Sequence, residues 1–262
     1  MSGGQERPPA RPRPGPARAF PGGTGLTVLE VYDAPCPDGL RGGSAHVHLA
    51  STEGYLVTAG AGRLQTLGSH GCAEVPLHPG DCLWFTPGTV HRLVNDGGLR
   101  IAVVMQNAGL PEAGDAVLTF PPEVLADPDR YAAAAALPAG AAQDVLAAAA
   151  RRRRDLAIEG YLALRDQVTA SGPAALEPFL AAATRLVRGR AADWRARWQE
   201  QAAAVAGLTG QHLSAIATGQ AGHLREGTLL RIPHPDGPPA FGMCGRLTTY
   251  PATAAEEPPA RL

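Results

Sequence analysis

The 262-residue sequence contains no lysine, so arginine supplies all 23 of its basic side chains. A mechanism that uses a lysine Schiff base or a lysine general base is therefore excluded. The basic residues are opposed by 24 acidic ones, which gives a formal net charge of -1, and aromatic residues make up only 5% of the chain. Nucleic-acid binding needs a clustered excess of basic side chains, and single-stranded bases need aromatic surfaces, so we expect no nucleic-acid partner.

The chain also lacks long apolar runs and closely spaced cysteines. No stretch approaches the roughly 18 uncharged apolar residues that a transmembrane helix requires, and residues 1–18 contain no apolar core of a signal peptide. The four cysteines form no C-x-x-C pair, which argues for scattered reduced thiols rather than a zinc ribbon. We therefore expect a cytoplasmic protein with no membrane partner.

The sequence pattern changes near residue 120. Residues 1–20 are rich in Pro, Gly and Arg and are predicted to form a disordered tail. Residues 21–120 contain short β-type runs separated by Gly, Pro and Asn-Asp turn signals, a spacing typical of a β-sandwich or barrel. Residues 121–225 are rich in alanine and carry apolar residues at helical spacing, which predicts an α-helical region. The predicted fold class is thus a β-barrel plus α.

Three smaller features follow in the second half. Asp127 before Pro128 is a typical N-cap and first helical position. The arginine run at 151–154 is predicted to be a solvated helix face. Residues 226–262 are predicted to form a hairpin and a C-terminal tail, with strands at 228–232 and 240–250 and the hairpin added to an edge of the front sheet.

The residues that carry chemistry are three histidines and one glutamate in the first half. His46 and His48 are two apart, so both side chains of a strand would point to the same side. Glu53 has the opposite parity, so a site that includes it requires a bend within residues 50–52. His91 follows a Pro-Gly turn, from which a neighbouring strand could supply a third imidazole. Such a ligand set suits a divalent transition metal: Fe, Mn, Ni, Cu, Co or Zn.

These residues fall into two motifs that resemble those of the cupin superfamily. The first comprises His46, His48, Glu53 and Gly60, and the second comprises Gly80, Gly88, His91 and Asn95. Two positions depart from the usual pattern, because Leu40 replaces the leading glycine and the proline is displaced to Pro87. The resemblance implies a double-stranded β-helix (jelly-roll) barrel, with His46, His48, Glu53 and His91 holding one metal in its mouth.

Strand parity indicates one further candidate near such a metal. If Glu53 points inward, so do Tyr55 and Val57, and Tyr55 could then be a catalytic proton donor or a residue that only fills the barrel. Parity does not decide whether Met105 or Gln106 faces inward.

The resemblance implies a metal-dependent protein that acts on a small molecule, most plausibly a mononuclear metal oxygenase. Two alternatives stay open: a non-catalytic cupin that binds or senses a small ligand, and a metal-dependent isomerase or lyase. Self-association into a homodimer is a further open alternative.

Overall fold

The computed structural model describes residues 16–254. Most of the predicted disordered tail, residues 1–15, and the last part of the predicted C-terminal tail, residues 255–262, lie outside the described residues. Residues 16–20 are ordered: Pro16–Arg18 form a 3-10 turn, and the Phe20 N–H donates to the carbonyl of Ala252 at 2.8 Å. The tail prediction is therefore wrong for residues 16–20, because they pair with the chain's last described segment. No helix in the described part of the chain has the length and hydropathy needed to cross a membrane.

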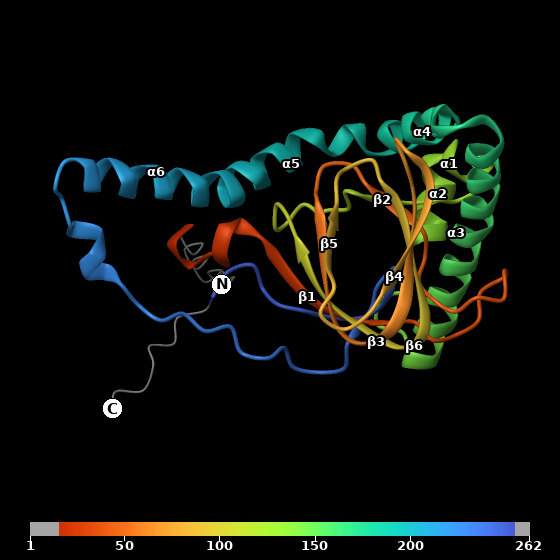
Figure 1. Ribbon diagram of the computed structural model, residues 1–262, viewed down its shortest axis with the longest axis horizontal. Coiled ribbons are helices and arrows are strands. Elements are labelled where there is room, and N and C mark those ends of the chain that lie inside the picture. The colour runs from red at the N-terminus through yellow and green to blue at the C-terminus, as the bar shows by residue number, and fades with distance from the viewer. Residues whose placement is uncertain (1–15, 255–262) are drawn as a thin grey trace, which may run out of the picture.

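Within residues 16–254, nine strands form one antiparallel sheet that curls into a barrel (Figure 1). The strands are β1 (Gly25–Val31), β2 (His46–His48), β3 (Glu53–Gly68), β4 (Gly71–Leu77), β5 (Cys82–Phe85), β6 (Val90–Met105), β7 (Ala116–Leu118), β8 (Ala240–Phe241) and β9 (Gly245–Thr249). The main order is β4-β3-β6-β1-β9-β8, with β5 paired to β3 and with β2 paired to both β6 and β7. This arrangement confirms the predicted barrel.

The two long strands, β3 and β6, bend sharply in the middle, and this bend closes the barrel. Their register shifts between Val57 and Gly62. Gly60 has a φ of +75°, and a Cβ on it would lie 2.2 Å from the Gly98 carbonyl, so a side chain there would be both strained and blocked. Asn95 fixes the facing bend: its amide donates to Val31 O at 3.0 Å and its carbonyl accepts the Leu99 N–H at 3.1 Å.

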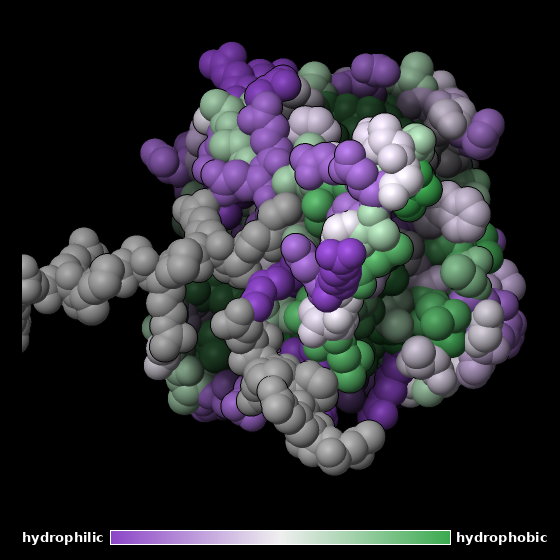
Figure 2. Space-filling model, turned by 90° about the vertical axis from the view of Figure 1, so that its left-hand side faces the viewer, coloured by the Kyte–Doolittle hydropathy of each residue, from purple (hydrophilic) through white to green (hydrophobic). Residues whose placement is uncertain are grey.

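In the described part of the chain, six α-helices lie between β7 and β8. They are α1 (Pro122–Leu125), α2 (Pro128–Ala135), α3 (Gln143–Ser171), α4 (Glu177–Val187), α5 (Ala191–Trp198) and α6 (Ala204–Ala217). Asp127 caps α2 as predicted, since its carboxylate accepts the N–H groups of Asp129 and Arg130. Helix α3 runs along one side of the barrel, and α4 to α6 continue across its top as an arm (Figure 1). Seen from the end that carries α6, the surface mixes apolar and polar side chains (Figure 2).

One apolar core joins the barrel to the helices. It unites barrel residues such as Val47 and Leu118 with Ile158, Tyr161 and Phe179 of the helices. A second core, which includes Leu29, Tyr55 and Ile101, fills the barrel itself. The half of β6 that starts at Val90 is accordingly buried on both faces over six consecutive residues, because the barrel interior covers one face and α3 the other.

The C-terminal segment returns to the barrel as a hairpin. Strand β9 pairs with β1 and with β8, so a hairpin does extend the sheet edge, but both of its strands lie within the single strand predicted at 240–250. The predicted strand at 228–232 is wrong, since residues 228–239 lie in no strand. Pro233 and Pro235 have no N–H for a ladder, and Leu229 is 68% exposed, so this apolar run has no partner to pair with or pack against.

The arginine run also departs from the prediction of a solvated face. Arg151 and Arg152 are exposed, but Arg154 is 2% exposed and its guanidinium donates to Ala34 O at 2.9 Å and to Pro35 O at 2.6 Å. Four consecutive residues of an α-helix, with about 3.6 residues per turn, point in all directions around the axis. Part of the run must therefore face the barrel.

Candidate metal centre

Three strands bring the four predicted ligand residues to one point inside the barrel. His46 and His48 lie on β2, and His46 is the register partner of His91 on β6. Glu53 is the first residue of β3, where it pairs with Phe85 of β5. Residues 49–52 lie in no strand, which confirms the bend that the parity of Glu53 required. All four residues are buried, and one ligand atom from each lies within 4.8 Å of the others.

The outer nitrogen of each imidazole faces an oxygen acceptor. Nδ1 of His46 lies 3.1 Å from Ser44 O, Nδ1 of His91 lies 3.1 Å from Thr89 O, and Nδ1 of His48 lies 2.6 Å from Asp115 Oδ1. A nitrogen next to an acceptor carries the proton, so these contacts assign the hydrogen to Nδ1 in all three rings. In the neutral rings the lone pair is then on Nε2, which points inward.

The three Nε2 atoms and the Glu53 carboxylate converge. Glu53 Oε2 lies 3.1 Å from His91 Nε2 and 3.3 Å from His48 Nε2, and the Nε2 atoms of His46 and His91 are 3.1 Å apart. Inward lone pairs and a carboxylate at such distances repel one another unless a positive charge lies between them. Three neutral imidazoles with one carboxylate are also a donor set that first-row transition metals accept, so the residues present fit a divalent metal.

The ionisation of the cluster agrees with this interpretation. Burial and the neighbouring histidines hold the pKa of His46 well below its usual value, so this ring is neutral. Burial opposes the ionised form of Glu53, but its interactions with His48 and His91 outweigh that effect and hold its pKa well below the usual range. Burial likewise opposes the charged form of His48, but hydrogen bonds with Asp115 and Glu53 raise its pKa to about 10. In the metal-free protein, a proton on His48 thus supplies the positive charge.

Asp115 is the member of this site that the sequence did not indicate. It lies just before β7, is fully buried, and contacts His48 through Oδ1 while Oδ2 has no hydrogen-bond partner. A carboxylate behind a histidine fixes the orientation of the ring and makes its other nitrogen a stronger ligand. Asp115 is 67 residues from His48 and belongs to no motif, so no local signal could have linked the two.

Tyr55 points into the barrel as parity predicted, and it is 1% exposed. Its ring packs edge-on against Phe85, and its hydroxyl has no hydrogen-bond partner among the described residues. Burial and the charge of Glu53 raise the pKa of this hydroxyl well above its usual value. Tyr55 does not line the pocket described next, so its catalytic role stays a prediction.

A pocket of about 300 Å³ opens onto His46, His48 and Glu53. Its walls are largely apolar and include Val103, Met105, Met243 and Leu247. Met105 is therefore the inward-facing residue at the end of β6, a choice that parity had left open. The volume is at the lower end of the range for small-molecule sites, which begins at about 300 Å³.

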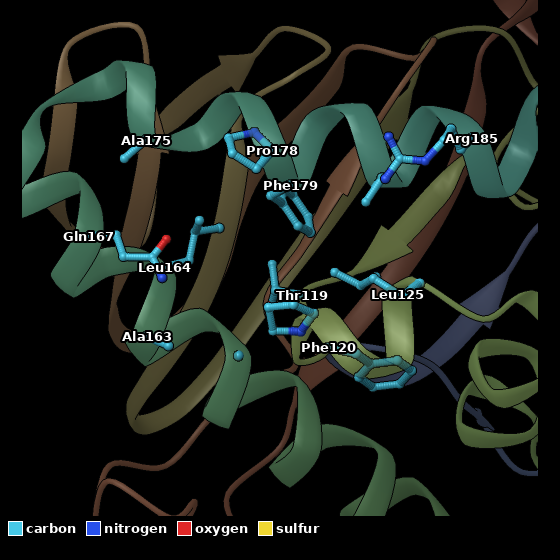
Figure 3. Close-up of a pocket in the computed structure, with 14 residues that line it drawn as sticks. Thr119, Phe120, Leu125, Ala163, Leu164, Gln167, Ala175, Pro178, Phe179 and Arg185 are labelled. Atoms are coloured by element: carbon cyan, nitrogen blue, oxygen red, sulfur yellow. The ribbon is translucent and has the colours of Figure 1, made fainter.

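A second cavity lies in the helical layer (Figure 3). It has a volume of about 290 Å³ and is lined by residues of α1, α3 and α4, with Phe179 facing Thr119 and Leu125 across it. Arg185 is the one ionisable residue in its described lining. This cavity therefore lacks the side chains for acid-base or metal chemistry.

Comparison with known proteins identifies the barrel. Residues 37–105 match the family model described as a cupin domain. A search of curated protein sequences found no match.

Among solved structures, the chain is similar to a predicted oxalate decarboxylase from Thermotoga maritima, with 22% identity over 32% of this chain and 64% of that chain and a TM-score of 0.24. It is also similar to a Klebsiella pneumoniae protein with a double-stranded β-helix domain, with 21% identity over 38% of this chain and 85% of that chain and a TM-score of 0.27. The chain thus spans less than two thirds of the Thermotoga protein.

Proposed function

We propose that this chain, in which residues 37–105 form a cupin domain, is a metal-dependent enzyme that acts on a small molecule. His46, His48, Glu53 and His91 would hold one divalent transition metal. The observation that carries the proposal is the orientation of the three imidazoles, each with its Nδ1 at an oxygen acceptor and its Nε2 directed at Glu53 or at another Nε2. A metal bound there would polarise a substrate oxygen or exchange electrons with a substrate.

The surrounding residues have separate roles in this proposal. Asp115 holds the His48 ring in place and adds negative charge behind it. The apolar walls at Val103, Met105 and Leu247 keep water away from the reacting groups and strengthen electrostatic interactions there. The open side of the cluster, at His46, His48 and Glu53, is where a substrate would reach the metal.

We propose an oxygenase as the reaction class. An isomerase or lyase commonly moves a proton with a general acid and a general base that touch the substrate. Apart from His46, His48 and Glu53, the ionisable side chains that line the described pocket are Glu112, Arg153 and Cys244. Burial raises the pKa of the Cys244 thiol, which makes it a poor proton donor, and an arginine is a poor donor as well. Glu112 is therefore a carboxylate base without a matching acid in this lining, which favours redox chemistry at the metal.

Metal analysis of the full-length protein, purified without added metal, tests the first part of the proposal. We expect about one transition metal per chain, lost in His48→Ala and retained in His70→Ala, whose histidine is exposed and is not part of the four-residue cluster. Retention of stoichiometric metal in His48→Ala would contradict the ligand assignment.

Oxygen-uptake screening of the metal-loaded protein with small organic substrates tests the second part. Oxygen consumption that depends on both metal and substrate supports an oxygenase. Turnover without oxygen consumption would instead assign an isomerase or lyase, and tight ligand retention without turnover would assign a binding or sensing protein.

A further inference from the structure

Arg153 lines the barrel pocket although it belongs to helix α3, outside the barrel. Two of its N–H groups donate to backbone carbonyls, Nη1 to Ala135 O at 3.2 Å and Nη2 to Gly242 O at 2.6 Å. Its Nε is buried and has no hydrogen-bond partner. The guanidinium is thus held in place by neutral oxygens, and part of its donor capacity is unused.

The charge of Arg153 has no counter-ion in the described part of the chain. The groups that interact with it electrostatically are Tyr32, Cys244 and Tyr131, none of which is a carboxylate. Burial lowers the pKa of Arg153 from its usual value, as expected for a cation removed from water without a partner. Arg153 is half-buried, and charges that are largely withdrawn from water are normally paired. The unpaired charge of Arg153 therefore favours binding of an anion next to its guanidinium.

The β8–β9 hairpin links Arg153 to the candidate metal centre. Gly242, which accepts from Arg153, is two residues from Cys244, and Cys244 Sγ lies 3.9 Å from His46 Nδ1. Residues 242–244 form the turn of this hairpin, so Gly242 and Cys244 are at most about 7 Å apart, and one pocket is lined by Arg153 together with His46, His48 and Glu53. A small molecule in the pocket could therefore reach the cluster with one end and Arg153 with the other.

Outside the cluster, the pocket's other charged wall residue is Glu112, which lies at the opposite end of β1. Glu112 Oε1 is 3.8 Å from the position of a Cβ on Gly25, and its Oε2 accepts the Gly109 N–H at 2.8 Å. Arg153 donates to the carbonyl of Gly242 on the hairpin. The Gly242 N–H in turn donates to the carbonyl of Gly245, and Gly245 is the register partner of Val31 at the end of β1. Gly25 and Val31 are six residues apart, about 20 Å along the strand backbone, and Glu112 is not among the groups that interact electrostatically with Arg153, so Glu112 does not neutralise Arg153.

We propose that Arg153 binds a carboxylate of the substrate, so that the pocket takes small organic acids with an apolar body. The metal-binding end of the substrate lies at His46, His48 and Glu53, and its carboxylate lies at Arg153 on the hairpin side. This assignment rests on the proposed function, because it needs a metal at the cluster to hold the other end.

The test uses full-length protein loaded with Zn²⁺ and six probes: the monohydroxamates of malonic, succinic and glutaric acid, and the same compounds with the carboxylate replaced by a primary amide. The hydroxamate binds the metal in every probe, so only the second group differs. Isothermal titration should show that at least one carboxylate binds about tenfold or more tightly than its amide, since a charge-assisted pair is stronger than a neutral hydrogen bond.

This preference should fall to about twofold or less in Arg153→Gln and in Arg153→Met, and it should persist in Arg152→Gln, which changes the exposed neighbour on the same helix. Zn²⁺ stoichiometry and melting temperature, measured for each variant, separate a lost anion contact from a lost fold. The wild-type comparison of carboxylate with amide needs no variant at all.

The outcomes distinguish the two proposals. If Zn²⁺ and all hydroxamates bind but no carboxylate is preferred, or if the preference survives in Arg153→Gln, the assignment of Arg153 is overturned while the metal site stands. If neither Zn²⁺ nor any hydroxamate binds, the proposed function fails and the assignment of Arg153 fails with it.

Discussion

The barrel and the helical layer each contain a cavity of similar volume, about 300 Å³ and about 290 Å³, but the two cavities differ completely in chemistry. The barrel cavity opens onto two histidines and a glutamate that are buried and ionically coupled. The helical cavity is lined mainly by small and apolar side chains, with Thr119, Gln167 and Arg185 as its polar members and no acidic or histidine side chain in the described lining. A hollow of suitable size is thus common to both regions, and only the buried polar groups distinguish a candidate active site from a packing defect.

The largest effect on folding is expected in the helical layer. Ile158 is fully buried in the core that joins α3 to the barrel. Ile158→Ala should lower the free energy of unfolding by about 2–5 kcal/mol, because it removes buried methyl groups and leaves a cavity. Urea denaturation measures this loss, and Val145→Ala, at a 46% exposed position of α3, is the control. Metal stoichiometry should not change; a loss of metal in folded Ile158→Ala would show that the two regions are not chemically separate.

In the barrel, metal affinity and the stability of the metal-free fold should both depend on pH, whereas the described lining of the helical cavity has no group that would produce such a dependence. The pKa of His48 is raised to about 10 in the metal-free protein, so metal must displace its proton at neutral pH. Apparent metal affinity should therefore rise about tenfold per pH unit between pH 7 and 9. The protonated His48 also stabilises the metal-free fold, fully below the unfolded-state pKa of about 6.5 and less as pH rises toward 10.

Two measurements check this pH dependence. Calorimetric titration of metal in buffers of different ionisation enthalpy should detect release of about one proton per metal at pH 7.5, and denaturation of the metal-free protein should show stability falling from pH 6.5 to 10. Metal binding without proton release would contradict the assignment of a protonated His48.

A smaller effect is expected from the carboxylate behind His48. Asp115→Asn retains the size of the side chain but removes the charge that orients and polarises the imidazole. Metal affinity should fall about 10- to 100-fold, the range typical of an outer carboxylate partner. Competition with a chelator measures this change, and Asp144→Asn, at an exposed position of α3, is the matched control. Equal affinities in Asp115→Asn and the wild type would mean that Asp115 only packs.

The smallest effect is expected at Tyr55. Because its hydroxyl has no partner among the described residues and does not line the pocket, Tyr55→Phe should change metal affinity and turnover by less than about threefold. Steady-state rates with any substrate found in the oxygen-uptake screen measure this, and Phe85→Leu reports the effect of disturbing the adjacent packing. A rate loss of more than tenfold in Tyr55→Phe alone would make Tyr55 a catalytic residue.

The sequence predicted the structure correctly where a feature depends on residues only a few positions apart. The two-residue spacing of His46 and His48, the parity of Glu53 and the Pro-Gly turn before His91 predicted the cluster, because strand geometry fixes side-chain direction over short distances. The N-cap at Asp127 followed from the same kind of local rule. Residues 228–232 show the limit of such rules, since a β-type run forms no strand unless another strand is available to pair with it.

The sequence by itself determined the four-residue His/Glu cluster, the barrel and the succession of helices, because periodicity and turn residues act over a few neighbouring positions. Only the tertiary structure decided that Asp115 stands behind His48 and that Arg153 enters the barrel pocket. Both contacts join segments far apart in the chain, and a run of arginines on a helix looks the same in sequence whichever side the barrel covers. Local pattern does not record burial. In the structure, Arg153 and Arg154 of this run are held by hydrogen bonds to backbone carbonyls instead of being solvated.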